Sequence, residues 1–390
     1  MFFLKDTISY IWPIITKYKW SFYGIFFLNA VRGILSAVII PIFYKKIIDI
    51  ISQTGVEKAT QFQSLLDSIF LIAIFMPLAW FFGRTTQHFV SKFQSKVMKD
   101  LQDFSFQKLH GHSYTFFADN FSGALVNKSR KFVRAFESMH DILIDNFWSA
   151  FVLFTAMFVV FFFQASLIAF VFLSMSVFYV TIVVLMSRKK VEYDLAESAA
   201  DSKVTATLAD SVTNFLSVKS SSALEREVKN FQSITANEAM LRLRAWMFGN
   251  KLNAIQSGMW MVLQIIVVFV TAHLWLTGKI SAGMFVLVQS YSVTIGHQFW
   301  ELGRATTRFT KSMSDMKEMV EIFKQKPDVL DVPNPEICKI GKGVIDIKNI
   351  SFAYLNGTRV FKSFNLKINS GEKIGLVGHS GSGKSTIVKI

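Results

Sequence analysis

Apolar residues in the first 300 positions gather into long runs, and charged residues collect between these runs rather than within them. Several runs approach or exceed the roughly 20 residues that an α-helix needs to cross a bilayer. Six such segments have the approximate bounds 20–44, 65–82, 142–163, 166–186, 255–276 and 284–300. The pattern favours membrane helices over the apolar segments of a soluble protein, so it predicts an all-α membrane domain.

The six segments are very unevenly spaced. The third and fourth are almost adjacent, and only residues 277–283 separate the fifth from the sixth. Two long connections, 83–141 and 187–254, contain no proline and are rich in helix formers with mixed charge. Because structureless loops of this length are uncommon, we predict that the membrane helices continue as long stalks, which turn back near 111–123 and 210–224.

Lysine and arginine concentrate in the two long connections. The positive-inside bias places both connections in the cytoplasm, and six spans put both chain termini there as well. Lys45 and Lys46 run against this assignment because they fall at the predicted outer end of the first span, although Asp49 and Glu57 lie close by. We expect an integral, multi-pass protein of the plasma or inner membrane with both termini cytoplasmic.

The composition agrees with a membrane protein, since 52% of the 390 residues are hydrophobic and 41 are phenylalanine. The formal charge of +15 could suggest a nucleic-acid partner, but membrane topology explains where the basic residues lie, and we expect no nucleic-acid partner. The single cysteine, Cys338, can form no intrachain disulfide and has no Cys or His neighbour at metal-site spacing. Redox chemistry and structural zinc are therefore not expected.

Residues 1–18 carry apolar side chains at helical intervals. A signal peptide is the rival interpretation, but Lys5 and Asp6 interrupt the apolar run and no small-residue cleavage site follows. The segment is therefore predicted to be an amphipathic helix lying at the membrane interface.

A change of pattern after residue 326 indicates a second domain. Prolines together with Asp and Asn mark residues 327–343 as a linker between a membrane domain, 1–326, and a domain fragment, 344–390.

Alternating apolar residues in the second domain predict strands over 344–352 and 360–368, with a turn at Asn356 and Gly357. A short apolar stretch, 374–377, is predicted to be a third, buried strand that leads into a glycine-rich loop. This order is typical of the β-rich start of a P-loop α/β domain.

The glycine-rich loop matches the P-loop pattern in full, between a predicted strand and a predicted helix. It consists of Gly378, His379, Ser380, Gly381, Ser382, Gly383, Lys384 and Ser385. Glycines let the backbone wrap a phosphate chain so that its N–H groups face the phosphates. Lys384 is expected to reach the β- and γ-phosphates, and the Ser385 hydroxyl to ligate Mg²⁺. An ordinary Gly-Ser linker explains this context poorly, and the dinucleotide-binding Gly-x-Gly-x-x-Gly spacing is absent.

The ten residues 377–386, VGHSGSGKST, resemble the phosphate-binding loop of ABC transporter ATPase domains, and SGEKIGLVG at 370–378 resembles the strand and turn that precede it. The resemblance implies that ATP and Mg²⁺ are bound by the P-loop residues and by Thr386. Tyr354, in the segment ISFAY, stands where the family places an aromatic ring that stacks on adenine. A tyrosine at a strand end is by itself more often a packing residue.

The membrane part, 1–326, is similar to the six-helix exporter type of the same superfamily. Residues 113–132 resemble the stretch that flanks the first coupling helix, and residues 209–227 resemble the second coupling segment. Phe132 departs from the family, which usually has an aspartate at this position, so the first coupling contact is expected to differ in detail.

Several polar side chains fall within the predicted spans or at their ends, where exposure to lipid is costly. These residues are Arg32, Gln289, Tyr291, Ser292, His297, Gln298 and Glu301. They are candidates for the lining of an interior cavity. Hydrogen bonds between helices, or snorkelling toward headgroups, are the alternatives, and the two interpretations are evenly balanced for each residue.

The resemblance implies an exporter-type half-transporter that pairs with an identical or related chain and uses ATP to export a small molecule, lipid or peptide. The family's catalytic glutamate, signature sequence and switch histidine would lie beyond Ile390, so we expect a truncated chain that does not hydrolyse ATP by itself. Two alternatives remain. The complete protein could be an ATP-binding membrane regulator or channel on the same scaffold, or the chain could be a short membrane protein that binds nucleotide without turnover.

Overall fold

The structure is a computed structural model that describes residues 2–55, 57–113, 116–117, 120, 122–325, 341, 343–353 and 359–388. The chain divides into two compact units, Met1–Asp328 and Val329–Ile390. Each unit is described by itself.

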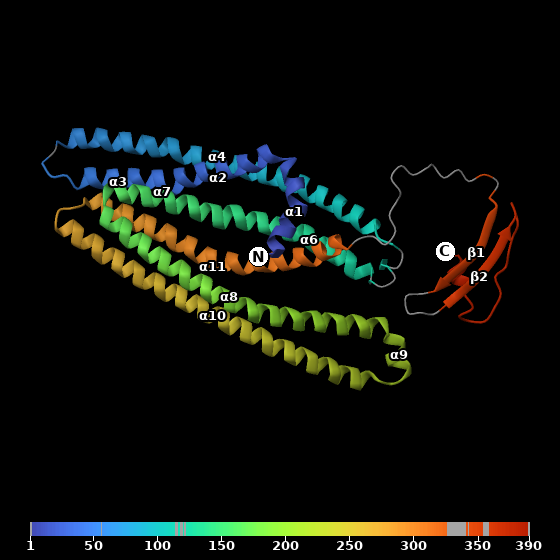
Figure 1. The fold of residues 1–390 in the computed structure, drawn as a ribbon. Coiled ribbons are helices and arrows are strands. Elements are labelled where there is room, and N and C mark those ends of the chain that lie inside the picture. Colours follow the sequence, from blue (N-terminus) through green and yellow to red (C-terminus); the bar gives the residue numbers. More distant parts are fainter. Residues whose placement is uncertain are drawn as a thin grey trace. The chain divides into compact units, whose positions relative to one another are not determined.

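Unit 1 is a bundle of long helices (Figure 1). In chain order they are α1 (Phe2–Thr16), α2 (Lys19–Ile34), η1 (Leu35–Ile39), α3 (Ile40–Ile51), α4 (Lys58–His110), α6 (Ser122–Asp141), η2 (Ile142–Trp148), α7 (Ser149–Gln164), α8 (Ser166–Thr213), α9 (Phe215–Ser220), α10 (Leu224–Leu276) and α11 (Ala282–Lys324). The segments η1 and η2 are π-helical turns that interrupt otherwise continuous α-helices.

The apolar segments run on into long helical stalks, as the sequence predicts. Helix α4 has 53 residues, and α8 and α10 have 48 and 53. Helices α8 and α10 pack side by side and are joined by the short helix α9, which lies within the predicted turning region 210–224 (Figure 1). The other turning region, 111–123, lies largely outside the described residues.

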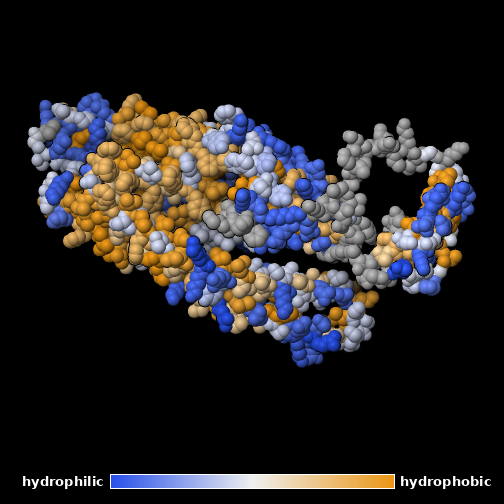
Figure 2. Space-filling view, viewed as in Figure 1, coloured by the Kyte–Doolittle hydropathy of each residue, from blue (hydrophilic) through white to orange (hydrophobic). Residues whose placement is uncertain are grey.

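Five helical segments of the described chain are long and apolar enough to cross a membrane: 19–51, 58–110, 123–164, 166–213 and 224–276. They correspond to the first five predicted spans. Helix α11 contains the sixth predicted segment but falls below this hydropathy criterion, because polar residues are frequent along it. It nevertheless packs against α3, α6, α8 and α10, inside the bundle. Figure 2 shows a broad apolar band over the middle of unit 1 and more hydrophilic ends.

Two clusters of buried apolar residues hold unit 1 together. The membrane cluster has 18 buried members, drawn mainly from α7, α8, α10 and α11, and includes Phe161, Phe172 and Phe299. The stalk cluster has 17 buried members, drawn mainly from α1, α4, α6 and α11, and includes Phe93 and Phe136. Helix α11 contributes to both clusters.

Helix α1 packs on the stalk cluster. Its Ile11 is 2% exposed, the Tyr10 ring lies 5.6 Å from the Phe323 ring between centroids, and Asp6 forms an ion pair with Lys324 of α11. Trp12 remains 44% exposed on another face. The helix is therefore as predicted, while its place at a membrane interface stays a prediction.

Unit 2 contains two antiparallel strands, β1 (Ile345–Ala353) and β2 (Arg359–Ile368). Both predicted strands are confirmed within one or two residues, and the predicted turn between them lies outside the described residues. The third predicted strand, 374–377, is wrong, since these residues form no strand and Val377 is 95% exposed. A strand forms only where a neighbouring strand completes its hydrogen bonds, and among the described residues β1 and β2 pair only with each other.

Candidate functional site

The glycine-rich loop lies between the extended segment after β2 and the short helix α12 (Lys384–Ile387). Gly381 and Gly383 have φ angles of +82° and +93°, which other residues rarely adopt. A Cβ atom on Gly383 would also lie 2.8 Å from Val360 Cγ1 of β2. Both a left-handed backbone and close packing on β2 therefore require glycine at 383.

Lys384 folds back across the loop. Its Nζ donates to the carbonyl oxygens of Gly378 and His379, both at 2.7 Å, and lies 3.3 Å from Ser382 Oγ. These acceptors are neutral, and the loop residues 378–382 are exposed. A phosphate oxygen carries a full charge and makes a stronger bond to an ammonium group than a carbonyl does, so it could replace these contacts.

Two further loop residues follow Lys384 directly. Ser385 is exposed, whereas Thr386 is 7% exposed and its backbone N–H donates to Gly383 O at 3.0 Å. On the other side of the loop, Nδ1 of His379 lies 2.8 Å from Ser380 O. The positive φ angles, the ammonium group and the exposed hydroxyl together fit a triphosphate with Mg²⁺. Tyr354 lies outside the described residues.

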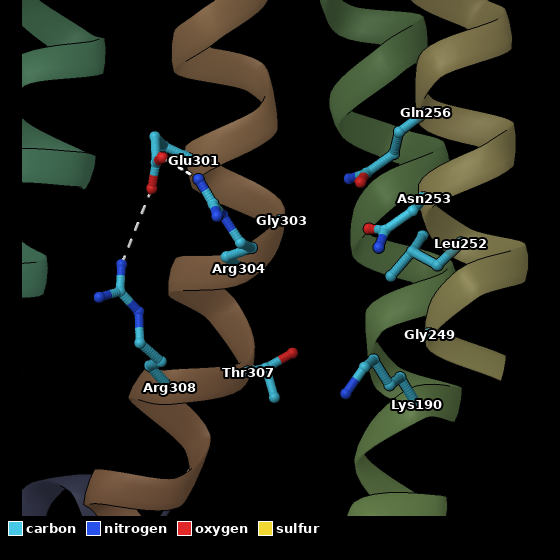
Figure 3. A pocket seen from close by; sticks show the side chains of 10 residues that line it. All are labelled: Lys190, Gly249, Leu252, Asn253, Gln256, Glu301, Gly303, Arg304, Thr307 and Arg308. Atoms are coloured by element: carbon cyan, nitrogen blue, oxygen red, sulfur yellow. Dashed lines mark hydrogen bonds and ion pairs between the residues drawn. The ribbon is translucent and has the colours of Figure 1, made fainter. Parts of the chain in front are cut away.

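A second site lies in unit 1, where α8, α10 and α11 border an open cavity of about 500 Å³, here called cavity A. Seven of its ten lining residues have polar side chains, and the ten are Lys190, Gly249, Leu252, Asn253, Gln256, Glu301, Gly303, Arg304, Thr307 and Arg308. Figure 3 shows Lys190 on α8 and Gln256 and Asn253 on α10 pointing toward the space beside α11. Three cations and one carboxylate line this cavity.

Gln256 is the most buried polar residue of cavity A. It is 2% exposed, and its Nε2 has no hydrogen-bond partner among the described residues. A Cβ atom on Gly303 would lie 2.3 Å from that nitrogen, so α11 can approach the amide only because residue 303 is glycine. A buried amide donor without a partner is costly in a native structure, and a ligand in the cavity could satisfy it.

On the other side of α11, a second cavity of about 580 Å³, cavity B, lies against α6 and η2. It is lined by Arg134, Glu137, Ser138, Asp141, Ile142, Asp145, Asn146, His297, Glu301 and Arg308. The π-helical turn η2 supplies Ile142, Asp145 and Asn146, and its N-cap residue, Asp141, lines the cavity as well. Glu301 and Arg308 line both cavities, so one stretch of α11 borders two polar spaces.

Four of the seven polar residues singled out from the sequence either line a cavity or are buried. His297 and Glu301 line cavities, as the interior-cavity interpretation expects. Tyr291 is fully buried in the membrane cluster, and its hydroxyl donates to Val38 O at 2.9 Å, so here the interhelical hydrogen bond is the correct alternative. Ser292 is also buried, and its Oγ has no described partner.

The remaining three residues line neither cavity A nor cavity B. Gln289 and Gln298 are half-buried on α11. Arg32 is exposed, and its side-chain Cδ lies 3.1 Å from the position of a Cβ atom on Gly83 of α4. Its aliphatic stem therefore covers a neighbouring helix.

Sequence reasoning missed most of cavity A. No local pattern singles out Lys190, Arg304, Arg308 or Gln256 as site residues. The spacing of Glu301, Arg304 and Arg308, at i, i+3 and i+7, could have shown that one helix face carries them together. The facing amide on α10 carries no sequence signal, because 47 positions separate Gln256 from Gly303 in the chain.

Comparison with known families covers both units. The family described as ABC transporter transmembrane region matches residues 22–299, and the family described as ABC transporter matches residues 361–390.

Relatives match at low identity along most of the chain. The ATM1-type heavy metal exporter of Novosphingobium aromaticivorans is 22% identical over 99% of this chain and 64% of its own length. Human ATP-binding cassette sub-family B member 6 is 23% identical over 90% of this chain and 42% of its own. The chain spans less than two thirds of the length of each of these relatives.

A solved structure shares the fold. The structure of a bacterial Atm1-family ABC exporter with ATP bound matches 99% of this chain and 65% of its own, with a TM-score of 0.75 and 20% sequence identity. Five spans, α11 and the P-loop-bearing unit thus occur together in a known architecture.

Proposed function

Because the chain belongs to the ABC transporter transmembrane region family, we propose that it exports a substrate across a membrane at the expense of ATP, as one half of a dimeric transporter. The observation that carries this proposal is the pairing of an apolar helical bundle with a complete P-loop sequence in one chain. A bundle alone would equally suit a channel, and a P-loop alone would suit any nucleotide-binding protein.

In this proposal the loop residues 378–386 hold the phosphates of ATP. The Lys384 ammonium group exchanges its carbonyl contacts for phosphate oxygens, and Ser385 supplies a hydroxyl ligand to Mg²⁺. Tyr354 supplies the aromatic surface for adenine. Bound ATP can drive transport only if it favours one arrangement of the membrane helices over another.

The substrate enters from the side of the membrane on which the charged stalks lie. Cavities A and B border α11 between the apolar band and the stalks, and polar groups in such a place mark substrate pathways in membrane proteins. The basic stalks favour a cytoplasmic location for this side and for both termini. The proposed division of the chain is a transmembrane domain, 1–326, a linker, 327–343, and the start of the nucleotide-binding domain, 344–390.

The first test concerns the P-loop in the full-length protein, purified in nanodiscs. Replacing Lys384 with alanine removes a charged donor to phosphate, and we expect the affinity for Mg²⁺-ATP to fall at least about tenfold in equilibrium binding. Lys367→Ala, on the neighbouring strand β2, is the matched control and should retain wild-type affinity. Unchanged ATP affinity in Lys384→Ala would contradict the proposed site.

The second test concerns export itself. Inside-out vesicles that contain the full-length protein are given ATP in a cytosolic extract, and the solutes they accumulate are identified by mass spectrometry. We expect at least one solute to accumulate with ATP and none to do so in vesicles that contain Lys384→Ala. Equal solute profiles in the two preparations would favour a regulator or channel instead.

A further inference from the structure

Glu301 stands at the centre of the charge arrangement around cavities A and B. Its side chain forms ion pairs with Arg304, one turn along α11, and with Arg308, whose Nη2 lies 3.9 Å from Glu301 Oε2. Figure 3 shows both guanidinium groups turned toward this one carboxylate. One internal anion therefore occupies both arginines that line cavity A.

The Glu301 carboxylate is more buried than the two arginine side chains that it pairs with. The Glu301 side chain is 21% exposed, whereas those of Arg304 and Arg308 are 58% and 55% exposed. Arg308 has a further, weak contact with Asn146 Oδ1 at 3.4 Å. The guanidinium groups thus keep donors that face solvent, and a guanidinium group has five N–H donors in all. An anion from solution can reach them without unfolding any part of the bundle.

Other groups in cavity A would accept the same kind of ligand. Gln256 offers a buried amide donor without a described partner, and Lys190 adds a third positive charge opposite α11. Lys190 is itself balanced by Asp194, at 2.6 Å. The volume of about 500 Å³ lies in the range of small-molecule sites. A ligand that carries a carboxylate or phosphate group fits this set of donors.

We propose that Glu301 is an internal competitor, which the carboxylate or phosphate group of an organic anion displaces from Arg304 and Arg308 when that anion enters cavity A. The inference rests on the proposed function, since it names the chemical class of the exported substrate. Displacement can couple substrate binding to a conformational change. Glu301 lines cavity B as well and, once it is released from the arginines, it can form interactions there.

The proposal predicts opposite effects on anion binding for the loss of Glu301 and the loss of either arginine. Removing the charge of Glu301 should strengthen anion binding, because the arginines lose their internal partner, and removing either arginine should weaken it. Exposed ion pairs are individually weak, so we expect Glu301→Gln to lower the half-saturating anion concentration about fivefold. Arg304→Gln should raise it by about the same factor.

The experiment uses the full-length protein in nanodiscs of phosphatidylcholine, without ATP. Equilibrium dialysis measures the binding of radiolabelled glutarate, a dicarboxylate, with glutaramide as an uncharged competitor of the same skeleton. Inorganic phosphate is the second probe. Because no nucleotide is present, absence of glutarate binding would not affect the conclusion about the P-loop. Unchanged ATP affinity in Lys384→Ala would likewise not affect the interpretation of the glutarate data.

Glu321→Gln is the matched control. It removes the same charge from the same helix, 20 residues and about 30 Å further along, where Glu321 pairs with Lys317. We expect wild-type glutarate binding in this variant and no competition by glutaramide. Gln256→Met, which keeps the volume and removes the amide donor, should weaken glutarate binding.

A lipid phosphate could supply the same anionic group. The dialysis is therefore repeated in nanodiscs that contain phosphatidylglycerol. If phosphatidylglycerol raises the half-saturating glutarate concentration of the wild type but not that of Arg304→Gln, the lipid headgroup also occupies the site. This result would support the displacement. The proposal is overturned if Glu301→Gln binds neither glutarate nor phosphate saturably, if it binds within twofold of the wild type, or if Glu321→Gln has the same effect.

Discussion

The membrane cluster and the stalk cluster are both built around buried phenylalanines, yet the first lies within the predicted spans and the second mainly in the charged stalks. Helix α11 supplies residues at helical spacing from Met284 to Phe299 to the first cluster and from Met316 to Phe323 to the second. Between these two stretches it carries Glu301, Arg304 and Arg308, which line the cavities.

The membrane cluster has close backbone contacts as well as large side chains. A Cβ atom on Gly283 would lie 2.1 Å from Lys45 O, and one on Gly296 would lie 2.4 Å from the Trp260 ring. Lipid tails are as apolar as leucine, so burial provides little driving force there, and small residues that permit close approach matter more. In the stalk cluster, the hydrophobic effect in water provides the main stabilisation. The polar cavities lie where one kind of packing gives way to the other.

The largest expected effect tests this contrast directly. Phe136 is 1% exposed in the stalk cluster, and Phe136→Ala should lower the free energy of unfolding by about 3 to 5 kcal/mol. Phe161 is 0% exposed in the membrane cluster, and Phe161→Ala should cost only about 1 to 3 kcal/mol, because its transfer to lipid is nearly neutral. Denaturant unfolding of the reconstituted protein measures both, and equal losses would remove the distinction between the clusters.

A smaller effect is expected where α3 meets α11. Gly283→Ala places a methyl group on the backbone oxygen of Lys45 and beside Asp49, so the helices must separate. We expect a loss of about 1 to 3 kcal/mol, typical of overpacking. Gly258→Ala on α10 is the control, since nothing lies within 4 Å of its Cβ position. It should be neutral or slightly stabilising because alanine is the better helix former. A Gly283 variant as stable as the Gly258 variant would contradict this close contact.

The smallest effect concerns a single hydrogen bond in the membrane cluster. Tyr291→Phe removes the donor to Val38 O, and we expect a loss of about 0.6 kcal/mol, the average for such bonds between membrane helices. Tyr179→Phe is the comparison, because the Tyr179 ring stacks on Phe299 at 4.2 Å and no described residue accepts its hydroxyl proton. It should leave the unfolding free energy unchanged. Equal effects of the two variants would mean that the Tyr291 bond contributes nothing.

The helices were predictable because each depends on local pattern. Apolar runs located five spans, and the absence of proline between them correctly indicated stalks. The sixth helix was also located, although it is more polar than the others. The strand at 374–377 could not be predicted correctly from local pattern, because a strand forms only where neighbours complete its hydrogen bonds.

The sites were predictable to different degrees. The P-loop residues are contiguous, so their order in the chain is their order in space, and the lysine contacts fall within the motif. Cavity A draws on three helices, and its amide, Gln256, meets α11 only through tertiary packing. Lys45, which conflicted with the positive-inside assignment, is balanced by Asp49 at 3.2 Å.

The start of α11 illustrates where local chemistry ends and tertiary structure begins. Ser281 accepts a hydrogen bond from Met284 N at 3.1 Å, a cap that lies three residues away and follows from the sequence alone. Asp49 accepts from Gly283 N at 2.8 Å across 234 positions of chain. Local hydrogen bonding and apolar periodicity determine which segments become helices, because they involve residues a few positions apart. Which helices meet, and so where charges face a common cavity, depends on side chains that only the folded bundle brings into contact.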